Sequence, residues 1–140
     1  MSRAGGCLCG AVRYELDADP GALINCHCRF CRRAHGAAFV TTTLVATSRL
    51  RVVQGADEIR HHRDRYFCGI CATRLYNRIA EQPAAAMLIV ASLDVEPERE
   101  PALHVNLESK APWFVIRDEA PRFESLPPGV ERNLQDLKEE

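Results

Sequence analysis

All seven cysteines of the 140-residue chain fall into three short clusters, in which one or two residues separate neighbouring cysteines. The clusters are Cys7 and Cys9, then Cys26, Cys28 and Cys31, and then Cys68 and Cys71. Thiolates at such spacings turn toward one metal ion, and zinc is the usual occupant. Because a structural zinc site closes with four ligands, seven clustered sulfurs exceed the needs of one ion.

The sulfurs divide most simply into four plus three. Joining the first and third clusters gives a closed site that ties the start of the chain to its middle, and such loop closure stabilises a fold. The middle cluster then forms a three-sulfur group with an open fourth position. Spacing alone also allows Cys7 and Cys9 to join Cys26 and Cys28.

A histidine could complete either site, and the chain has five: His27, His35, His61, His62 and His104. The ordinary role of any one of them is a solvated or hydrogen-bonded side chain. His27 is expected to point away from the flanking cysteines if its segment is extended.

Strand-like segments separated by Gly, Pro and Asp turns dominate the sequence and predict a mainly β protein. The expected strands are residues 11–16, 37–46, 50–53, 74–79, 87–93 and 103–107. We expect 59–67 to form an exposed strand or hairpin. Residues 28–35 favour one or two helical turns that end at Gly36, which would place Cys28 and Cys31 on one face.

The size and composition indicate a single domain, residues 1–140, with a core at about 5–113 and a mostly irregular, proline-containing tail. Val130, Leu134 and Leu137 in this tail could form a short closing helix. The net charge of −1 argues against a generally basic nucleic-acid binder. With neither a signal peptide nor a membrane span in the sequence, we expect a cytoplasmic protein whose thiols stay reduced.

Four ordered motifs, residues 6–14, 26–34, 67–73 and 104–113, resemble those of the glutathione-dependent formaldehyde-activating enzyme family, which includes the centromere protein V group. The resemblance implies an Mss4-like fold of short antiparallel sheets stapled by zinc. It also implies a structural zinc at Cys7, Cys9, Cys68 and Cys71, and a second, catalytic-type zinc at Cys26, Cys28 and Cys31. The chain looks like the shorter branch of the family.

The activity implied by the resemblance is that of a zinc-dependent carbon–sulfur lyase acting on a thiol adduct of a small carbonyl compound, with a glutathione-like substrate. Zinc with an open position lowers the pKa of a bound thiol. Three arginines beside the middle cluster, Arg29, Arg32 and Arg33, are the candidates for holding substrate carboxylates. His104 or Tyr76 could transfer a proton.

The sequence also allows two other functions. A non-catalytic zinc module for protein or nucleic-acid partners would bind through a basic stretch, Arg60, His61, His62, Arg63 and Arg65. Because stacking aromatic residues are sparse there, nucleic acid is the less expected partner. Alternatively, the middle cluster could be a redox-active or metal-buffering group of thiols. Trp113 is expected to complete the core.

Overall fold

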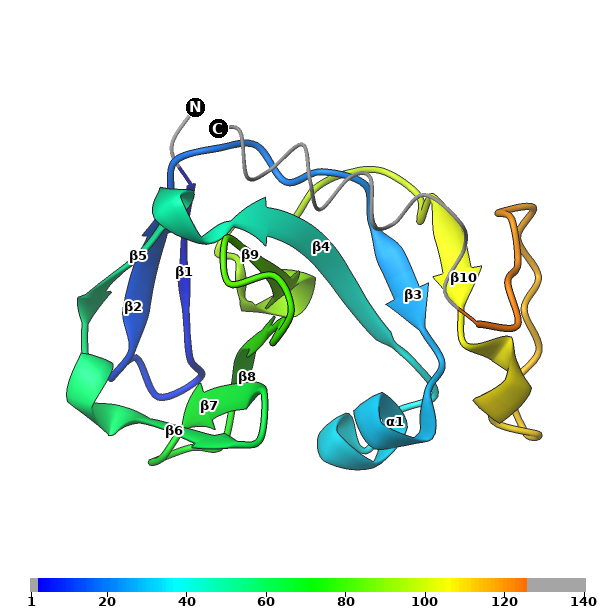
Figure 1. The fold of residues 1–140 in the computed structure, drawn as a ribbon, viewed down its shortest axis with the longest axis horizontal. Coiled ribbons are helices and arrows are strands. Elements are labelled where there is room, and N and C mark those ends of the chain that lie inside the picture. Colours follow the sequence, from blue (N-terminus) through cyan, green and yellow to red (C-terminus); the bar gives the residue numbers. More distant parts are fainter. Residues whose placement is uncertain (1–2, 126–140) are drawn as a thin grey trace.

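The computed structural model describes residues 3–125, which form two β-sheets, one short α-helix and several 3-10 turns. Figure 1 shows the smaller sheet on one side and the larger sheet extending from it, by way of the long curved strand β4, to β10 at the far edge. This arrangement confirms the predicted mainly β fold. No helix in the described part of the chain is long and apolar enough to cross a membrane.

The smaller sheet is antiparallel and has the order β1-β2-β5. Its strands are β1 (Arg3–Gly6), β2 (Arg13–Leu16) and β5 (Leu50–Gln54). Strand β2 alternates as its sequence predicts, because Tyr14 and Leu16 are buried while their neighbours are partly exposed. Strand β1 was not expected from the sequence, since two of its four residues are glycines.

The larger sheet has the order β10-β3-β4-β9-β8-β7-β6. In that order its strands are Leu103–Val105, Ile24–Cys26, Val40–Ala46, Ala85–Ile89, Arg74–Arg78, Arg65–Cys68 and Ile59–His62. All neighbours pair antiparallel except β10 with β3, which are parallel and so depart from the expected antiparallel pattern. The strand expected at 87–93 ends earlier, because Val90–Ser92 turn into a 3-10 helix.

Helix α1 (Arg29–His35) follows β3 directly, as the sequence predicts. Cys28 is its N-cap, and the Sγ of Cys28 accepts a hydrogen bond from the backbone N–H of Cys31 at 3.2 Å. The helix ends at Gly36, whose φ of 62° is left-handed and therefore favours glycine. Local capping thus turns two of the cysteines toward each other.

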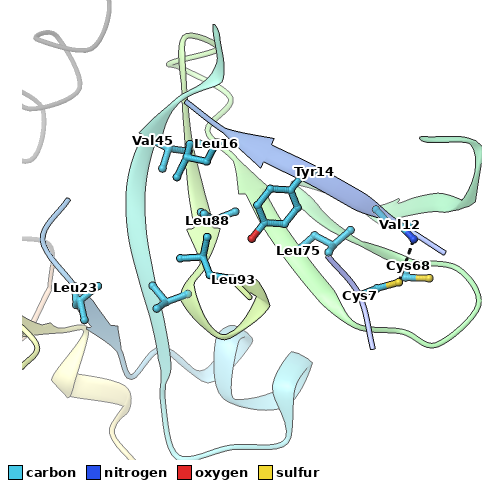
Figure 2. Packing of buried hydrophobic residues seen from close by; sticks show 12 residues of the cluster. Cys7, Val12, Tyr14, Leu16, Leu23, Val45, Cys68, Leu75, Leu88 and Leu93 are labelled. Atoms are coloured by element: carbon cyan, nitrogen blue, oxygen red, sulfur yellow. Dashed lines mark hydrogen bonds between the residues drawn. The ribbon is translucent and has the colours of Figure 1, made fainter. Parts of the chain in front are cut away.

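The main hydrophobic core lies between the two sheets (Figure 2). Tyr14 and Leu16 of β2 pack in one cluster with Leu75 of β8 and Leu88 of β9. Cys68 belongs to the same cluster and is fully buried. The packing of the core therefore extends directly into one group of cysteines.

A buried polar contact joins the sheets at Tyr14. The Tyr14 hydroxyl lies 2.7 Å from Ser92 Oγ, which also donates to the carbonyl oxygen of Ile89 at 2.7 Å. Burial raises the pKa of Tyr14 to about 12. Gly5 of β1 approaches this contact so closely that an added Cβ would lie 2.4 Å from the Ser92 carbonyl oxygen.

The prediction that Trp113 completes the core is wrong, because its side chain is 68% exposed. The neighbouring Phe114 packs instead, with its ring centroid 5.4 Å from that of Phe39. Trp113 instead faces Arg32, whose guanidinium lies 6.0 Å from the centroid of the indole ring, since an indole can cover an arginine at the surface as well as fill a core. The closing helix expected at 130–137 lies outside the described residues.

Candidate metal centres

The first and third cysteine clusters meet at one end of the core, and we call the four residues the clasp: Cys7, Cys9, Cys68 and Cys71. Their sulfurs all lie within 4.8 Å of one another. The Sγ atoms of Cys7 and Cys9 are 3.6 Å apart, and those of Cys9 and Cys68 are 3.9 Å apart. A tetrahedral zinc with bonds of about 2.3 Å separates its sulfur ligands by about 3.8 Å. The clasp therefore has the donor set and the size for a metal ion.

Neighbouring polar groups form hydrogen bonds with three of the four clasp sulfurs. The backbone N–H of Val12 donates to Cys7 Sγ at 3.2 Å, and that of Ile70 donates to Cys68 Sγ at 3.4 Å. Hydrogen bonds from the side chain and backbone of Thr73 lower the pKa of the Cys71 thiol to about 5. Because a thiolate is the form that coordinates metal, these contacts suit a bound cation.

The middle cluster forms a separate group, which we call the trio: Cys26, Cys28 and Cys31, again with sulfurs within 4.8 Å of one another. Cys26 ends β3, Cys28 caps α1, and Cys31 lies in the first turn of the helix. Asn106, which follows β10, donates its side-chain N–H to Cys26 Sγ at 3.3 Å. The ends of two strands and one helix thus position the three sulfurs.

Ionised sulfurs in the trio repel one another unless a cation lies between them. Hydrogen bonds from the thiols of Cys26 and Cys31 hold the pKa of the Cys28 thiol far below its ordinary value, at about 2. The sulfurs of Cys26 and Cys28 raise the pKa of Cys31 in turn. Three adjacent sulfurs cannot all ionise by themselves, whereas a divalent ion would stabilise all three thiolates.

An apolar support lies behind the trio. Val40 of β4 and Ile89 of β9 are each 5% exposed and pack in one cluster with Cys31, which is 6% exposed. Both apolar residues also line a groove of about 560 Å³, together with His35 and Phe39. The trio and the groove therefore share a wall.

The three arginines predicted to bind substrate lie on α1 in different surroundings. Arg29 and Arg33 are exposed. Arg32 donates to the carbonyl oxygen of Ser109 at 2.7 Å, and its guanidinium lies 6.0 Å from the centroid of the Trp113 ring. Arg32 thus attaches the helix to the segment after β10, and its role toward a substrate stays a prediction.

Two arginines that the sequence did not connect with the trio lie on adjacent strands and contact α1. Arg65 of β7 stacks its guanidinium 5.6 Å from the centroid of the Phe30 ring, and Arg74 of β8 contacts His35 Nε2 at 3.2 Å. Phe30 and His35 flank Cys31 on the helix. The structure therefore places two cationic side chains at the junction that carries the trio.

These two guanidinium groups are incompletely paired. The Nε atoms of Arg65 and Arg74 are both buried and have no hydrogen-bond partner in the described part of the chain. Arg65 contacts the partly exposed carboxylate of Asp64, whereas Arg74 contacts no carboxylate among residues 3–125. Burial lowers the pKa of Arg74, and the charge of Arg65 lowers it further. The junction therefore places two guanidinium groups beside the trio, one of which has no carboxylate partner among the described residues.

The two buried histidines near the trio contact each other. His27 Nε2 lies 2.8 Å from His104 Nδ1, and the rings are 0% and 1% exposed. Burial lowers the pKa of His27 to about 4, and repulsion from His104 adds to the effect. The sequence did not predict this pair, because the two residues are 77 positions apart. Their spatial contact follows from the parallel pairing of β3 with β10.

The basic stretch proposed for a binding module forms the hairpin β6–β7, as predicted. Its rings stack on one another: His61 lies 5.0 Å from Tyr66, and Tyr66 lies 4.9 Å from Tyr76, measured between centroids. Arg78 covers Tyr66 at 4.9 Å. Tyr76 thus stacks on Tyr66, whose ring also contacts His61 and Arg78.

The geometry defines a mainly β protein with two separate cysteine groups, each able to hold a metal ion. The family model described as "Glutathione-dependent formaldehyde-activating enzyme" matches residues 2–109. The chain belongs to this family.

Two relatives extend the comparison. A Halomonas elongata protein named "Putative glutathione-dependent formaldehyde-activating enzyme" is 27% identical over 128 residues, which cover 83% of this chain and 82% of the relative. A crystal structure of a Rhodobacter sphaeroides protein superposes with a TM-score of 0.58 at 29% identity, over 67% of this chain and 91% of that one. The similarity therefore spans most of each of these proteins.

Proposed function

We propose that this protein is a zinc-dependent enzyme of the carbon–sulfur lyase type, which forms or cleaves the bond between a carboxylate-bearing thiol and a small carbonyl compound. In the forming direction the thiol sulfur bonds to the carbonyl carbon. The carbonyl π bond becomes a C–O single bond, and the thiol proton passes to the oxygen by way of solvent. The substrate class follows the family to which the chain belongs.

The observation that carries this proposal is the separation of the trio from the clasp. A structural zinc needs four ligands, and the clasp supplies four sulfurs by itself. The trio offers three sulfurs, of which two are only partly buried. Zinc held by Cys26, Cys28 and Cys31 would supply an open position at which a thiol loses its proton at neutral pH.

The residues around the trio orient its sulfurs. The N–H of Cys31 and the side chain of Asn106 each donate to a sulfur, which fixes the directions of Cys28 and Cys26. Val40 and Ile89 exclude water from the inner side of Cys31. These contacts hold the trio in one geometry before a substrate arrives, which reduces the cost of reaching the reactive arrangement.

Arg65 and Arg74 suit the carboxylates of a glutathione-like thiol. Both guanidinium groups lie at the same junction as the trio, and a guanidinium attracts a carboxylate through its charge and its N–H donors. The neighbouring groove, about 560 Å³ in volume, offers space for the rest of a small peptide thiol. The expected contributors Arg29 and Arg33 are more exposed and would act at longer range.

The test is the rate at which glutathione and formaldehyde combine, measured by exchange NMR with and without the zinc-loaded protein. We expect the wild-type protein to accelerate the exchange and Cys28→Ser to abolish the acceleration while the fold is retained. Ser48→Ala is the matched control, because Ser48 is exposed and lies far from all three cysteine clusters in the sequence. Equal rates with wild-type protein and with buffer, for several thiols and aldehydes, would reject the proposed function.

A further inference from the structure

Three polar side chains form a continuous hydrogen-bonded chain beside the trio. Both carboxylate oxygens of Asp118 lie 3.0 Å from His104 Nε2, and His104 Nδ1 lies 2.8 Å from His27 Nε2. The two rings are buried, whereas the Asp118 side chain is 38% exposed. These hydrogen bonds thus run from the surface to the ring of His27, the residue between Cys26 and Cys28.

The Asp118 carboxylate determines which atoms donate and which accept in these hydrogen bonds. A carboxylate only accepts hydrogen bonds, so His104 Nε2 must carry a proton and donate it to Asp118. In a neutral His104 ring the Nδ1 atom is then an acceptor, so His27 must carry its proton on Nε2. His27 Nδ1 is then a bare acceptor, and it has no partner within the described residues.

The same elements also hold the backbone of His27. Its N–H donates to the carbonyl oxygen of Val105 at 3.0 Å. His104 is held on its other side by the segment that carries Asp118, because the His104 N–H donates to Pro121 and its carbonyl oxygen accepts from Phe123. Figure 1 shows this segment, in orange, alongside β10. The ring and the backbone of His27 are therefore both fixed to one edge of the sheet.

We propose that Asp118 and His104 are positioning residues, which hold His27 in the tautomer with its proton on Nε2 and so fix the chain between Cys26 and Cys28. The effect of these residues on metal binding rests on the proposed function of the trio, whereas their effect on the His27 tautomer does not. Without an acceptor at Asp118, His104 would exchange between tautomers. His27 would then lose its single hydrogen-bonded orientation, and two ligands of the trio would lose a fixed spacing.

Long-range ¹H–¹⁵N NMR of the full-length protein as isolated reads the tautomer directly. We expect the His27 ring to show a protonated Nε2 and a bare Nδ1. In Asp118→Leu we expect signals of both tautomers, together with a metal affinity of the trio that is about 10- to 100-fold weaker by chelator competition, while the clasp keeps its affinity. Asp118→Glu, which retains a carboxylate, should restore part of the affinity.

Thr41→Val is the matched control, because Thr41 makes a separate hydrogen bond, at 2.7 Å, to the buried Asn25 of β3. It should destabilise the same sheet without changing the tautomer or the metal affinity of the trio. A proton on His27 Nδ1 in the wild-type protein would overturn the proposal, even if Asp118→Leu failed to fold. An equal loss of affinity in Thr41→Val would also overturn it. If the trio binds no metal, the proposed function fails, and the tautomers in wild type and Asp118→Leu alone decide this inference.

Discussion

At the scale of single residues, the two cysteine groups differ in what surrounds their sulfurs. The clasp receives hydrogen bonds from the backbone N–H groups of Val12 and Ile70, and Cys68 is fully buried in the main core. The trio instead lies beside two arginines, Arg65 and Arg74, of which Arg74 has no carboxylate partner among the described residues. This contrast suits a closed structural site in the first case and an anionic ligand in the second.

Substitution of Arg74 tests whether its charge acts on the substrate or on the trio. Arg74→Gln should raise the KM for glutathione about tenfold, because a hydrogen bond to a charged group is worth about 1.5–3 kcal/mol. The exposed Arg51→Gln on β5 of the smaller sheet is the control and should leave the KM nearly unchanged. With glutathione whose carboxylates are esterified, the difference between Arg74→Gln and wild type should disappear. An equal defect toward both thiols would show that Arg74 acts on the trio and not on the substrate.

At the scale of the elements, the smaller sheet packs on the larger one through very close backbone contacts. Gly5 of β1 forms an isolated antiparallel bridge with Leu93, and the Asp94 N–H donates to the Ala4 carbonyl oxygen at 2.9 Å. A side chain on Gly5 would meet both the Tyr14 ring and the Ser92 backbone. The glycine therefore decides how near β1, and the cysteines after it, can come to the rest of the clasp.

Gly5→Ala should accordingly destabilise the protein by about 1–3 kcal/mol, because the neighbouring backbone must shift to admit the methyl group. Gly21→Ala is the control, since a Cβ there would make only ordinary contacts at 3.6 Å or more. Chemical denaturation of the zinc-loaded proteins measures the difference. A Gly5→Ala variant as stable as Gly21→Ala would show that β1 adapts to the added methyl group without strain.

At the scale of the whole molecule, the sequence predicted local features better than distant ones. Alternation located β2, and capping by Cys28 and Gly36 located α1, because these signals act over a few residues. The contact of His27 with His104 depends on the parallel pairing of β3 with β10, which no short pattern encodes. Trp113 shows the same limit, since its apolar character alone did not reveal that it lies at the surface.

The sequence predicted the composition of the two cysteine groups through their spacing and the family motifs, and the structure brings the same sulfurs together. It did not identify that Arg65 and Arg74 both contact α1, because they are not cross-strand partners and a register shift separates their positions on β7 and β8. Residues that act by charge at a site can come from any neighbouring strand. Spacing in the sequence is therefore a sound guide to the sulfurs that meet within one turn and a poor guide to their electrostatic partners.

The two cysteine groups should contribute unequally to the stability of the whole protein, and single substitutions test this. The clasp joins segments about sixty residues apart in the chain and continues the main core, so a metal bound there closes a long loop. A structural zinc contributes about 10–16 kcal/mol in small zinc domains, which matches or exceeds the stability of a typical domain. Cys71→Ser should therefore lose the folded state, whereas Cys31→Ser should retain it.

Metal content per chain and circular dichroism, measured on the same samples, give the answer. We expect two zinc ions per chain in the wild-type protein and one in Cys31→Ser, with an unchanged spectrum and a similar melting temperature. Cys71→Ser should lack both the spectrum of the folded protein and the metal, because β3, which carries Cys26, belongs to the same sheet as β7, which carries Cys68. If Cys31→Ser unfolds as completely as Cys71→Ser, the trio is structural and the carbon–sulfur chemistry proposed for it has no open site. If Cys71→Ser stays folded with one zinc, the stability of the protein comes from its packed core and not from the clasp.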